Sequence, residues 1–517
     1  MTSLRLQFSS FLKSDRAWAV LAGAAFALIV VLGQNRNVGW EPGYNELQPG
    51  HHGWVSSHTL AVIAHATPAN GFVGYALASL DEDGKLDFDY FDRYPVYFSA
   101  GMHALLSWKP RLSTQVFLAK EAMNVVFLLT VATAYLLLRK LSLGPARSLV
   151  AVFLAVSSPY LLFYKDMVHY DQPALLGTLL LVLAIAHAKI DGRRRLVYAA
   201  TLVATSLGRG YASLAVLLVW FLLEAFDLLR RSAPGLRARI GGMFSLTATR
   251  ALMLGVGWAA VNLAYNVGVE AAKRGLAVSQ TSIFLSAVNR LALSEEFNAS
   301  YADLLAWRYF FSDELIRLVR WSFPVWEYEG SWFVSALIAV LMIALIIVFA
   351  RRIDPARRMV LTVLLLAGPL WLIAMRNLSA FHDYTAMYFL GIPLAFFASA
   401  VSLIPLPRYG WALAVFLSLS VFAARHAQIQ NLHREIGAVY SPYTHDFMRI
   451  AAALPPGAQR IHLADGIPYA PYAFGFYLPD DILAPIGRAD YVITRRPASG
   501  STVLTAENSY FFLVENR

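Results

Sequence analysis

The chain has 517 residues, of which 58% are hydrophobic and only 15% are charged, whereas soluble proteins carry about 25% charged residues. Its formal net charge is +10 and it contains no cysteine, which excludes disulfides, thiolate metal sites and cysteine nucleophiles. Apolar runs of about 17–22 residues recur along most of the length, so the composition predicts a polytopic α-helical membrane protein.

Eleven apolar segments have the character of membrane spans. We expect these spans near residues 17–33, 118–138, 146–163, 172–188, 195–208, 211–229, 251–268, 331–350, 359–375, 385–404 and 410–425. The segment at 195–208 is short, so it is either a full span or a half-span joined to the next one through Gly208-Arg209-Gly210. The first segment shows no small-residue cleavage site, which favours a signal-anchor over a cleaved signal peptide.

Lysines and arginines indicate how the spans are oriented. They concentrate in the N-terminal segment and in alternate short connections, at 139–147, 189–195, 230–250, 351–358 and 408. By the positive-inside rule this side faces the cytoplasm. We therefore predict a multi-pass protein of the cytoplasmic (inner) membrane, whose loops at 34–117 and 269–330 and whose tail face the periplasm or cell exterior. Because topology and anionic membrane lipids explain the basic charge, nucleic acid is not an expected partner.

The first outer loop, at 34–117, is dense in titratable and aromatic groups. Two helices are expected along the interface, near 52–66 and 95–108. Within the acidic stretch from Asp81 to Asp92, Asp81-Glu82-Asp83-Gly84-Lys85 has the composition of a solvated turn. Asp92-Arg93-Tyr94-Pro95 opens the second helix, and a basic residue beside a tyrosine at a membrane face suits a phosphate contact.

Histidines in this loop are spaced by seven residues, at His51, His58 and His65. On a helix they share one face but lie about 10 Å apart in succession, too far to chelate one ion. His51 and His52 with a distant carboxylate stay an alternative metal site, which we do not favour. His65 is expected to sit in the wet interface, whereas His51 and His52, beside Trp54, are functional candidates.

Ionisable residues elsewhere gather at the outer ends of the spans: Lys165, Asp166, His169, Asp171, Arg209, His382 and Asp383. Glu224 and Asp227 are exceptions near an inner end, where they can pair with Arg230 and Arg231. Transporters place such groups near the midplane. The pattern therefore favours a reaction at the outer interface over a path through the membrane.

The tail has helical periodicity over 433–454 and strand patterns at 460–463, 490–494 and 510–514. We predict an all-α polytopic bundle over residues 1–425, with juxtamembrane helices in its first outer loop, followed by a small α/β domain over residues 426–517.

Several motifs occur in an order that resembles a known family. They are Gly50-His51-His52-Gly53-Trp54, Tyr94-Pro95-Val96-Tyr97-Phe98, Ser157-Ser158-Pro159 with Asp166 and Asp171, Gly208-Arg209-Gly210, and Phe381-His382-Asp383-Tyr384 with Pro393. In this order the chain resembles the GT-C superfamily of membrane glycosyltransferases over residues 17–405. The likeness is to bacterial proteins related to protein O-mannosyltransferases and lipid A aminoarabinose transferases.

The resemblance implies transfer of a sugar from a polyprenyl-phosphate donor to a lipid, glycan or protein acceptor, with no soluble cofactor required and a divalent metal not favoured. Such a transfer needs a base for the acceptor hydroxyl. The family's first loop offers an aspartate where this chain has Gly50. The candidates for the base are therefore Glu46 and His51, then Glu41 and Asp171.

The leaving phosphate needs cations and hydrogen-bond donors. The candidates for binding the donor phosphate and substrate are His52, Arg93, Tyr94, Lys165, Arg209, His382 and Asp383.

Two other functions stay open from the sequence. A polysaccharide polymerase or ligase would also use a polyprenyl-linked substrate, although its large outer loop usually lies late in the chain. A non-enzymatic membrane transporter or assembly protein is the alternative from a different class. Transfer or hydrolysis of a labelled polyprenyl-phosphate sugar separates the enzymes from the non-enzymatic proteins.

Overall fold

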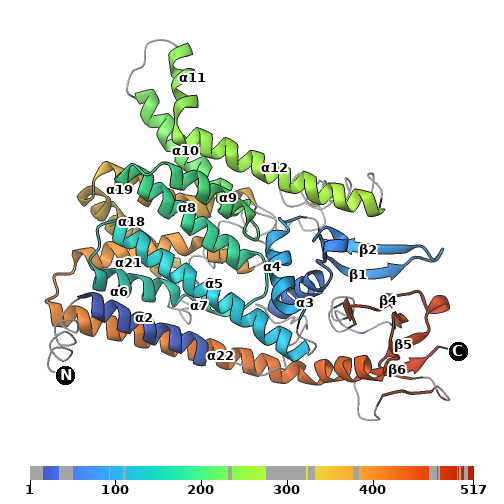
Figure 1. Cartoon of the computed structure of the whole chain (residues 1–517). Helices are drawn as coiled ribbons and strands as arrows, with labels where there is room; N and C mark the ends of the chain where they lie inside the picture. The colour runs from blue at the N-terminus through green and yellow to red at the C-terminus, as the bar shows by residue number, and fades with distance from the viewer. Residues whose placement is uncertain are drawn as a thin grey trace, which may run out of the picture.

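The computed structural model describes residues 15–33, 51–91, 93–108, 112–230, 236–274, 322–323, 332–375, 383–464, 474–475, 478–497, 499, 502–505 and 511–516. Long helices form a bundle, and short strands lie together beyond one end of it (Figure 1). The second large loop, at 269–330, lies mostly outside these residues.

Helices account for each of the eleven predicted spans. The bundle contains α2 (Asp15–Leu32), α5 (Leu112–Lys140), α6 (Pro145–Val156), α7 (Pro159–Tyr164), α8 (Asp171–Asp191), α9 (Arg195–Ser206), α10 (Ala212–Arg230), α11 (Leu236–Ser245), α12 (Thr247–Arg274), α18 (Trp332–Arg352), α19 (Pro355–Ala374), α21 (Gly391–Leu403) and α22 (Arg408–Ala453). In the part of the chain that is described, six helices are long and apolar enough to cross a membrane: α5, α8, α10, α12, α19 and α22. The polytopic fold predicted from the sequence is confirmed.

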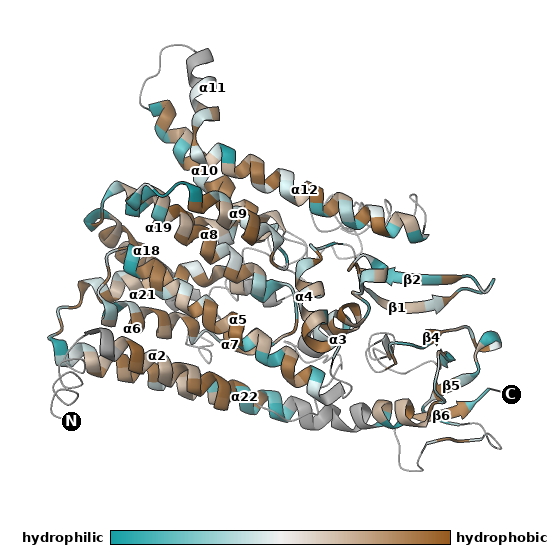
Figure 2. Cartoon of the chain, viewed as in Figure 1, coloured by the Kyte–Doolittle hydropathy of each residue, from teal (hydrophilic) through white to brown (hydrophobic). Residues whose placement is uncertain are grey.

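The outer faces of the bundle are apolar. On α5, the side chains of Val125, Leu129 and Leu136 are 55%, 50% and 50% exposed, and their spacing puts them on neighbouring parts of one helix surface. Figure 2 shows hydrophobic residues along most of the bundle helices. Exposed apolar side chains in this number indicate a surface that faces lipid.

One predicted span, at 146–163, is broken in the structure. Ser157 turns its hydroxyl back to the Phe153 carbonyl at 2.6 Å, and Ser158 then caps α7 by accepting from the Leu161 N–H at 3.4 Å. Pro159 occupies the first turn of α7, where the missing N–H costs nothing. The Ser-Ser-Pro motif is therefore the stop of one helix and the start of the next.

The first long loop, at 34–117, forms the two helices expected within it, α3 (His51–Ala64) and α4 (Tyr97–Leu106). A short helix η1 (Pro68–Asn70) and two antiparallel strands, β1 (Tyr75–Leu80) and β2 (Leu86–Tyr90), lie between them. The solvated turn expected at Asp81 to Lys85 is confirmed: its acidic residues are exposed, and the Lys85 N–H donates to the Asp81 carboxylate at 2.7 Å. The rest of the acidic stretch belongs largely to β2.

The tail contributes β3 (Arg460–Leu463), β4 (Ile482–Leu483), η4 (Ile486–Arg488), β5 (Tyr491–Thr494) and β6 (Phe512–Glu515). These strands join the loop hairpin in one sheet of order β2-β1-β4-β3-β5-β6. Ser79 of β1 pairs in parallel with Leu483 of β4. The first loop and the tail therefore build a single structure, which α22 reaches by continuing as one helix past residue 425.

Close backbone contacts fix α3 to this sheet. A Cβ on Gly74 would lie 1.9 Å from the Val62 carbonyl oxygen of α3. The ring of His65 stacks on Tyr75 at 3.8 Å, and its Nε2 lies 2.8 Å from the Pro479 carbonyl oxygen. The expectation that His65 merely sits in the wet interface is therefore wrong, because its ring joins the loop to the tail.

We predict that Gly74→Ala destabilises the protein by about 1–3 kcal/mol, since the added methyl overlaps backbone that cannot move independently. The matched control is Gly101→Ala on α4, where a Cβ meets nothing within 4 Å and helix propensity improves by about 0.5–1 kcal/mol. When unfolding is measured in detergent, the midpoint of the unfolding transition should be lower for Gly74→Ala than for the unaltered chain, and equal or higher for Gly101→Ala. Equal midpoints would contradict the close-contact argument.

Candidate functional site

A buried polar cluster, here called the Asp171 cluster, lies where α8 begins. It consists of Asp171, His169, Arg209, Tyr388 and Tyr94. Asp171 Oδ2 lies 2.5 Å from His169 Nδ1. Its Oδ1 accepts a hydrogen bond from the Tyr388 hydroxyl at 2.9 Å and lies 3.3 Å from Arg209 Nη1. The carboxylate is fully buried and Arg209 is 3% exposed, so one carboxylate organises three groups away from water.

The turn Gly208-Arg209-Gly210 explains why Arg209 reaches this carboxylate. Gly208 has φ +53°, and a Cβ there would lie 1.9 Å from the Tyr170 carbonyl oxygen. That same oxygen accepts the Arg209 N–H at 3.0 Å. A Cβ on Gly210 would lie 2.2 Å from the Thr205 carbonyl oxygen. Gly208 is required because the turn is pressed against the start of α8, and Gly210 because the chain there folds back on the last turn of α9.

Tyr388 arrives from η3 (Asp383–Leu390), which packs closely on α19. A Cβ on Gly368 would lie 2.1 Å from the Tyr388 carbonyl oxygen, and one on Gly391 would lie 2.1 Å from the Leu364 carbonyl oxygen. The absence of side chains at these two positions lets the segments touch through their backbones. This contact brings the Tyr388 hydroxyl within reach of Asp171.

Tyr94 connects the first outer loop to the cluster. The Arg209 guanidinium lies over its ring, 4.9 Å from the centroid, a distance at which cation–π attraction operates. Its carbonyl oxygen accepts from the Asn266 amide of α12 at 2.7 Å. Arg93, its neighbour, lies 5.8 Å from the Phe91 ring. Arg93 and Tyr94 of the predicted phosphate-contact segment therefore lie beside the same buried groups.

His58 of α3 is part of the same neighbourhood. Its pKa is lowered to about 3, chiefly by burial and in smaller part by the charges of His169 and Arg93. Its ring meets the Phe91 ring edge to face at 4.9 Å. His58 is thus neutral at pH 7 and adds no positive charge beside Arg93.

A second group, here called the Lys165 cluster, joins α7 to α5. It consists of Lys165, Asp166, Lys120, Glu121 and Asn124. Lys165 is fully buried, and its ammonium donates to the Asn124 amide oxygen at 2.9 Å. Burial lowers the pKa of Lys165, while the charges of Asp166 and Glu121 oppose that shift. These carboxylates support a buried ammonium four residues before His169 of the Asp171 cluster.

The structure brings together Asp171, Arg209, Arg93 and Tyr94 of the residues predicted from the sequence, with Lys165 in the adjoining cluster. His51 and His52 start α3 and Asp383 starts η3, but their side chains lie outside the described part. Glu41, Glu46 and His382 also lie outside it. Within the described ranges no three His, Asp or Glu side chains converge as metal ligands.

Sequence reasoning missed two members as site residues, His169 and Tyr388. The position of His169, two residues before Asp171, could have indicated its role, because a histidine just before a helix can hydrogen-bond a carboxylate in the first turn of that helix. Tyr388 offered no such signal, since one tyrosine in an apolar segment has no distinguishing pattern. Both engage the oxygens of Asp171, which suits that carboxylate to orient His169 and Arg209.

We predict that lowering the pH reduces the stability of the fold because of His58. Between about pH 6.5 and pH 3 the unfolded chain binds a proton on His58 that the folded chain does not. Stability therefore falls as the pH falls through this window, by at most about 1.4 kcal/mol per pH unit. His58→Gln should flatten the dependence of the unfolding midpoint on pH between 4 and 6.5. An unchanged slope would show that His58 does not titrate differently on folding.

No protein-family model and no curated protein matches the sequence. The fold does match solved structures. ArnT from Cupriavidus metallidurans bound to undecaprenyl phosphate is 13% identical, with a TM-score of 0.58 over 98% of this chain and 99% of that one. The Archaeoglobus fulgidus oligosaccharyltransferase in its apo form is 11% identical, with a TM-score of 0.52 over 93% of this chain and 69% of that one.

The archaeal enzyme tethered to an acceptor peptide with an NVT sequon gives the same TM-score, 0.52, at 10% identity. Its match covers 93% of this chain and 69% of that one. This chain therefore shares the fold of these solved structures over nearly its whole length.

Proposed function

We propose that this protein transfers a sugar from a polyprenyl-phosphate-linked donor to an acceptor hydroxyl on a lipid, glycan or protein. The reaction would take place at the outer face of the cytoplasmic membrane. The observation that carries the proposal is the full-length structural match to ArnT bound to undecaprenyl phosphate. The second support is the Asp171 cluster, a buried, cation-bearing site at the junction of the bundle and the first loop.

The donor end of the reaction requires stabilisation of a leaving phosphate. The turn Gly208-Arg209-Gly210 holds Arg209 beside the first residues of α8. An arginine side chain can bind phosphate oxygens bidentately. Lys165 and Arg93 supply further positive charge from neighbouring segments. When the bond from the anomeric carbon to the phosphate oxygen breaks, its electron pair passes to the phosphate, and these cations would stabilise it.

The acceptor end requires a base. Glu46 and His51 rank first, followed by Glu41, while Asp171 has both oxygens engaged by protein groups. The structure adds His169 as a candidate. Hydrogen bonding from Nδ1–H to Asp171 would fix the tautomer whose Nε2 accepts a proton. The transferred proton then leaves the acceptor hydroxyl as its oxygen attacks the anomeric carbon.

No soluble cofactor is needed for this displacement, since the polyprenyl phosphate is itself the leaving group. His52, Tyr94, His382 and Asp383 complete the proposed contacts to the donor and its sugar. The sheet that joins the first loop to the tail ends four residues before Tyr94 and would guide the acceptor toward the site.

The first test is transfer of a radiolabelled sugar from a polyprenyl-phosphate donor by membranes that contain the protein. Arg209→Gln should reduce the turnover by about 100-fold or more, the usual effect of removing a group that stabilises developing charge. Gly208→Ala should lower it as well, because the turn that carries Arg209 cannot form unstrained. Arg352→Gln, on the exposed end of α18, is the control and should keep full activity.

Two results would oppose the proposal: no transfer or hydrolysis with any of several sugars, or full activity in Arg209→Gln. A product that grows by repeating units would instead assign the chain to the polymerase class.

The base is tested by separate substitutions, Glu46→Gln, Glu41→Gln, His51→Gln and His169→Gln. Loss of the true base should reduce turnover by about 100-fold or more and remove the lower limb of the pH–rate profile. Loss of a group that only positions substrate should raise KM and leave that limb in place. If all four variants keep both turnover and the pH profile, none of these residues is the base.

A further inference from the structure

A cavity of about 540 Å³ lies at the end of α8 opposite the Asp171 cluster. Its walls come from the last turn of α8 and the connection to α9, the last turns of α10, and the start of α12. Lys189 on α8 is 18 residues beyond Asp171, which corresponds to about 27 Å along the helix. The cavity is therefore separate from the proposed catalytic site, and its volume is in the range of small-ligand sites, about 300–1,000 Å³.

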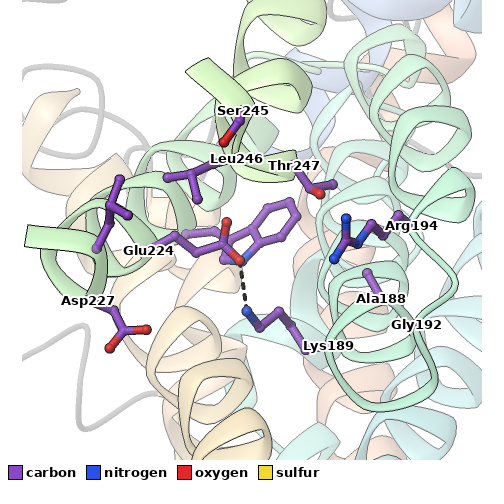
Figure 3. Close-up of a pocket in the computed structure, with 11 residues that line it drawn as sticks. Ala188, Lys189, Gly192, Arg194, Glu224, Asp227, Ser245, Leu246 and Thr247 are labelled. Atoms are coloured by element: carbon purple, nitrogen blue, oxygen red, sulfur yellow. Dashed lines mark hydrogen bonds and ion pairs between the residues drawn. The ribbon is translucent and has the colours of Figure 1, made fainter. Parts of the chain in front are cut away.

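Charges of both signs line this cavity. Lys189 pairs with Glu224 at 2.9 Å, a partner that the sequence did not suggest. Arg194 and Asp227 also contribute to the walls. Figure 3 shows Arg194 on one side near Thr247 and Asp227 on the other, with the Lys189–Glu224 pair between them.

This arrangement selects among ligand charges. The two cations and two carboxylates sum to zero, so a purely anionic or purely cationic ligand would face a like charge across the cavity. A phosphate suits the Arg194 wall, where Thr247 supplies a hydroxyl and α12 presents its first N–H groups. An ammonium suits the Asp227 wall. A ligand that carries one phosphate and one ammonium complements both walls.

The depth of the cavity in the membrane indicates the source of that ligand. Helix α8 is an apolar span of 21 residues, about 30 Å long, which equals the thickness of the hydrocarbon core. The cavity begins in its last turn, at Ala188 and Lys189. That level is where lipid head groups lie.

We propose that this cavity binds the head group of a zwitterionic aminophospholipid, such as phosphatidylethanolamine, with the phosphate at Arg194 and Thr247 and the ammonium at Asp227. The site is independent of the proposed transferase activity. It gives the bundle a specific lipid contact at the end away from catalysis.

The test measures lipid retention by the full-length protein, delipidated in detergent, using native mass spectrometry. Phosphatidylethanolamine, phosphatidylglycerol and phosphatidylcholine are added at equal concentrations. Phosphatidylethanolamine should bind at least tenfold more tightly than the other two, because phosphatidylglycerol lacks the cation and phosphatidylcholine lacks ammonium N–H donors. Equal retention of all three lipids would overturn the proposal.

Variants sharpen the test by changing preference. Asp227→Asn removes the negative wall, so it should reverse the preference toward phosphatidylglycerol. Arg194→Gln should weaken the binding of phosphatidylethanolamine about tenfold without reversing the preference. Arg195→Gln, the adjacent exposed arginine outside the cavity walls, is the matched control and should bind as the unaltered chain does. A fall of equal size for every lipid in Asp227→Asn would contradict head-group recognition.

Soluble glycerophosphoethanolamine distinguishes the lipid from its free head group. We expect it to compete at least tenfold more weakly than the lipid, because it lacks the acyl chains that hold a head group at this depth. Competition as strong as that of the lipid would overturn the membrane assignment.

Discussion

The buried contact between Asp171 and Arg209 is the constraint on which the site depends. Two charges removed from water lose solvation, and their attraction compensates only when the surrounding polar groups are well placed. Here His169 and Tyr388 engage the carboxylate and the Tyr94 ring faces the guanidinium. The glycines at 208, 210 and 368 permit the backbone contacts that set this geometry. Removing one partner would leave the other charged and buried, which is costlier than never having built the pair.

The first outer loop and the tail are coupled through one sheet. A hairpin at residues 75–90 pairs with a strand that follows it by some 400 positions in the chain. His65 adds a contact to the Pro479 carbonyl across the same boundary. Tyr94, four residues after that hairpin, lies against Arg209. The position of the tail and the position of the arginine therefore depend on a shared set of elements, so loosening the sheet would also loosen the wall of the site.

Hydropathy predicted the bundle well, because crossing a bilayer demands about 20 apolar residues whatever their tertiary partners. It failed where structure depends on distant pairing. Asp87 and Asp89 belong to β2, a strand that the sequence did not indicate, since the pairing partner of a strand is not visible in its own sequence. The same holds for the site: Asp171 and Arg209 stood out as charges beside apolar spans, whereas Tyr388 acquires its role only from the packing of η3 on α19.

Helix α8 shows how charges for two separate sites are accommodated in one span. Asp171 lies in its first turn and Lys189 in its last. The helix dipole favours a negative group at the first end and a positive group at the second. Each charge thus gains from the helix that carries it as well as from its partner, Arg209 at one end and Glu224 at the other. Exchanging the two signs would oppose the dipole at both ends, so the direction of α8 itself favours an acidic group at the proposed catalytic end and a basic group at the lipid-binding end.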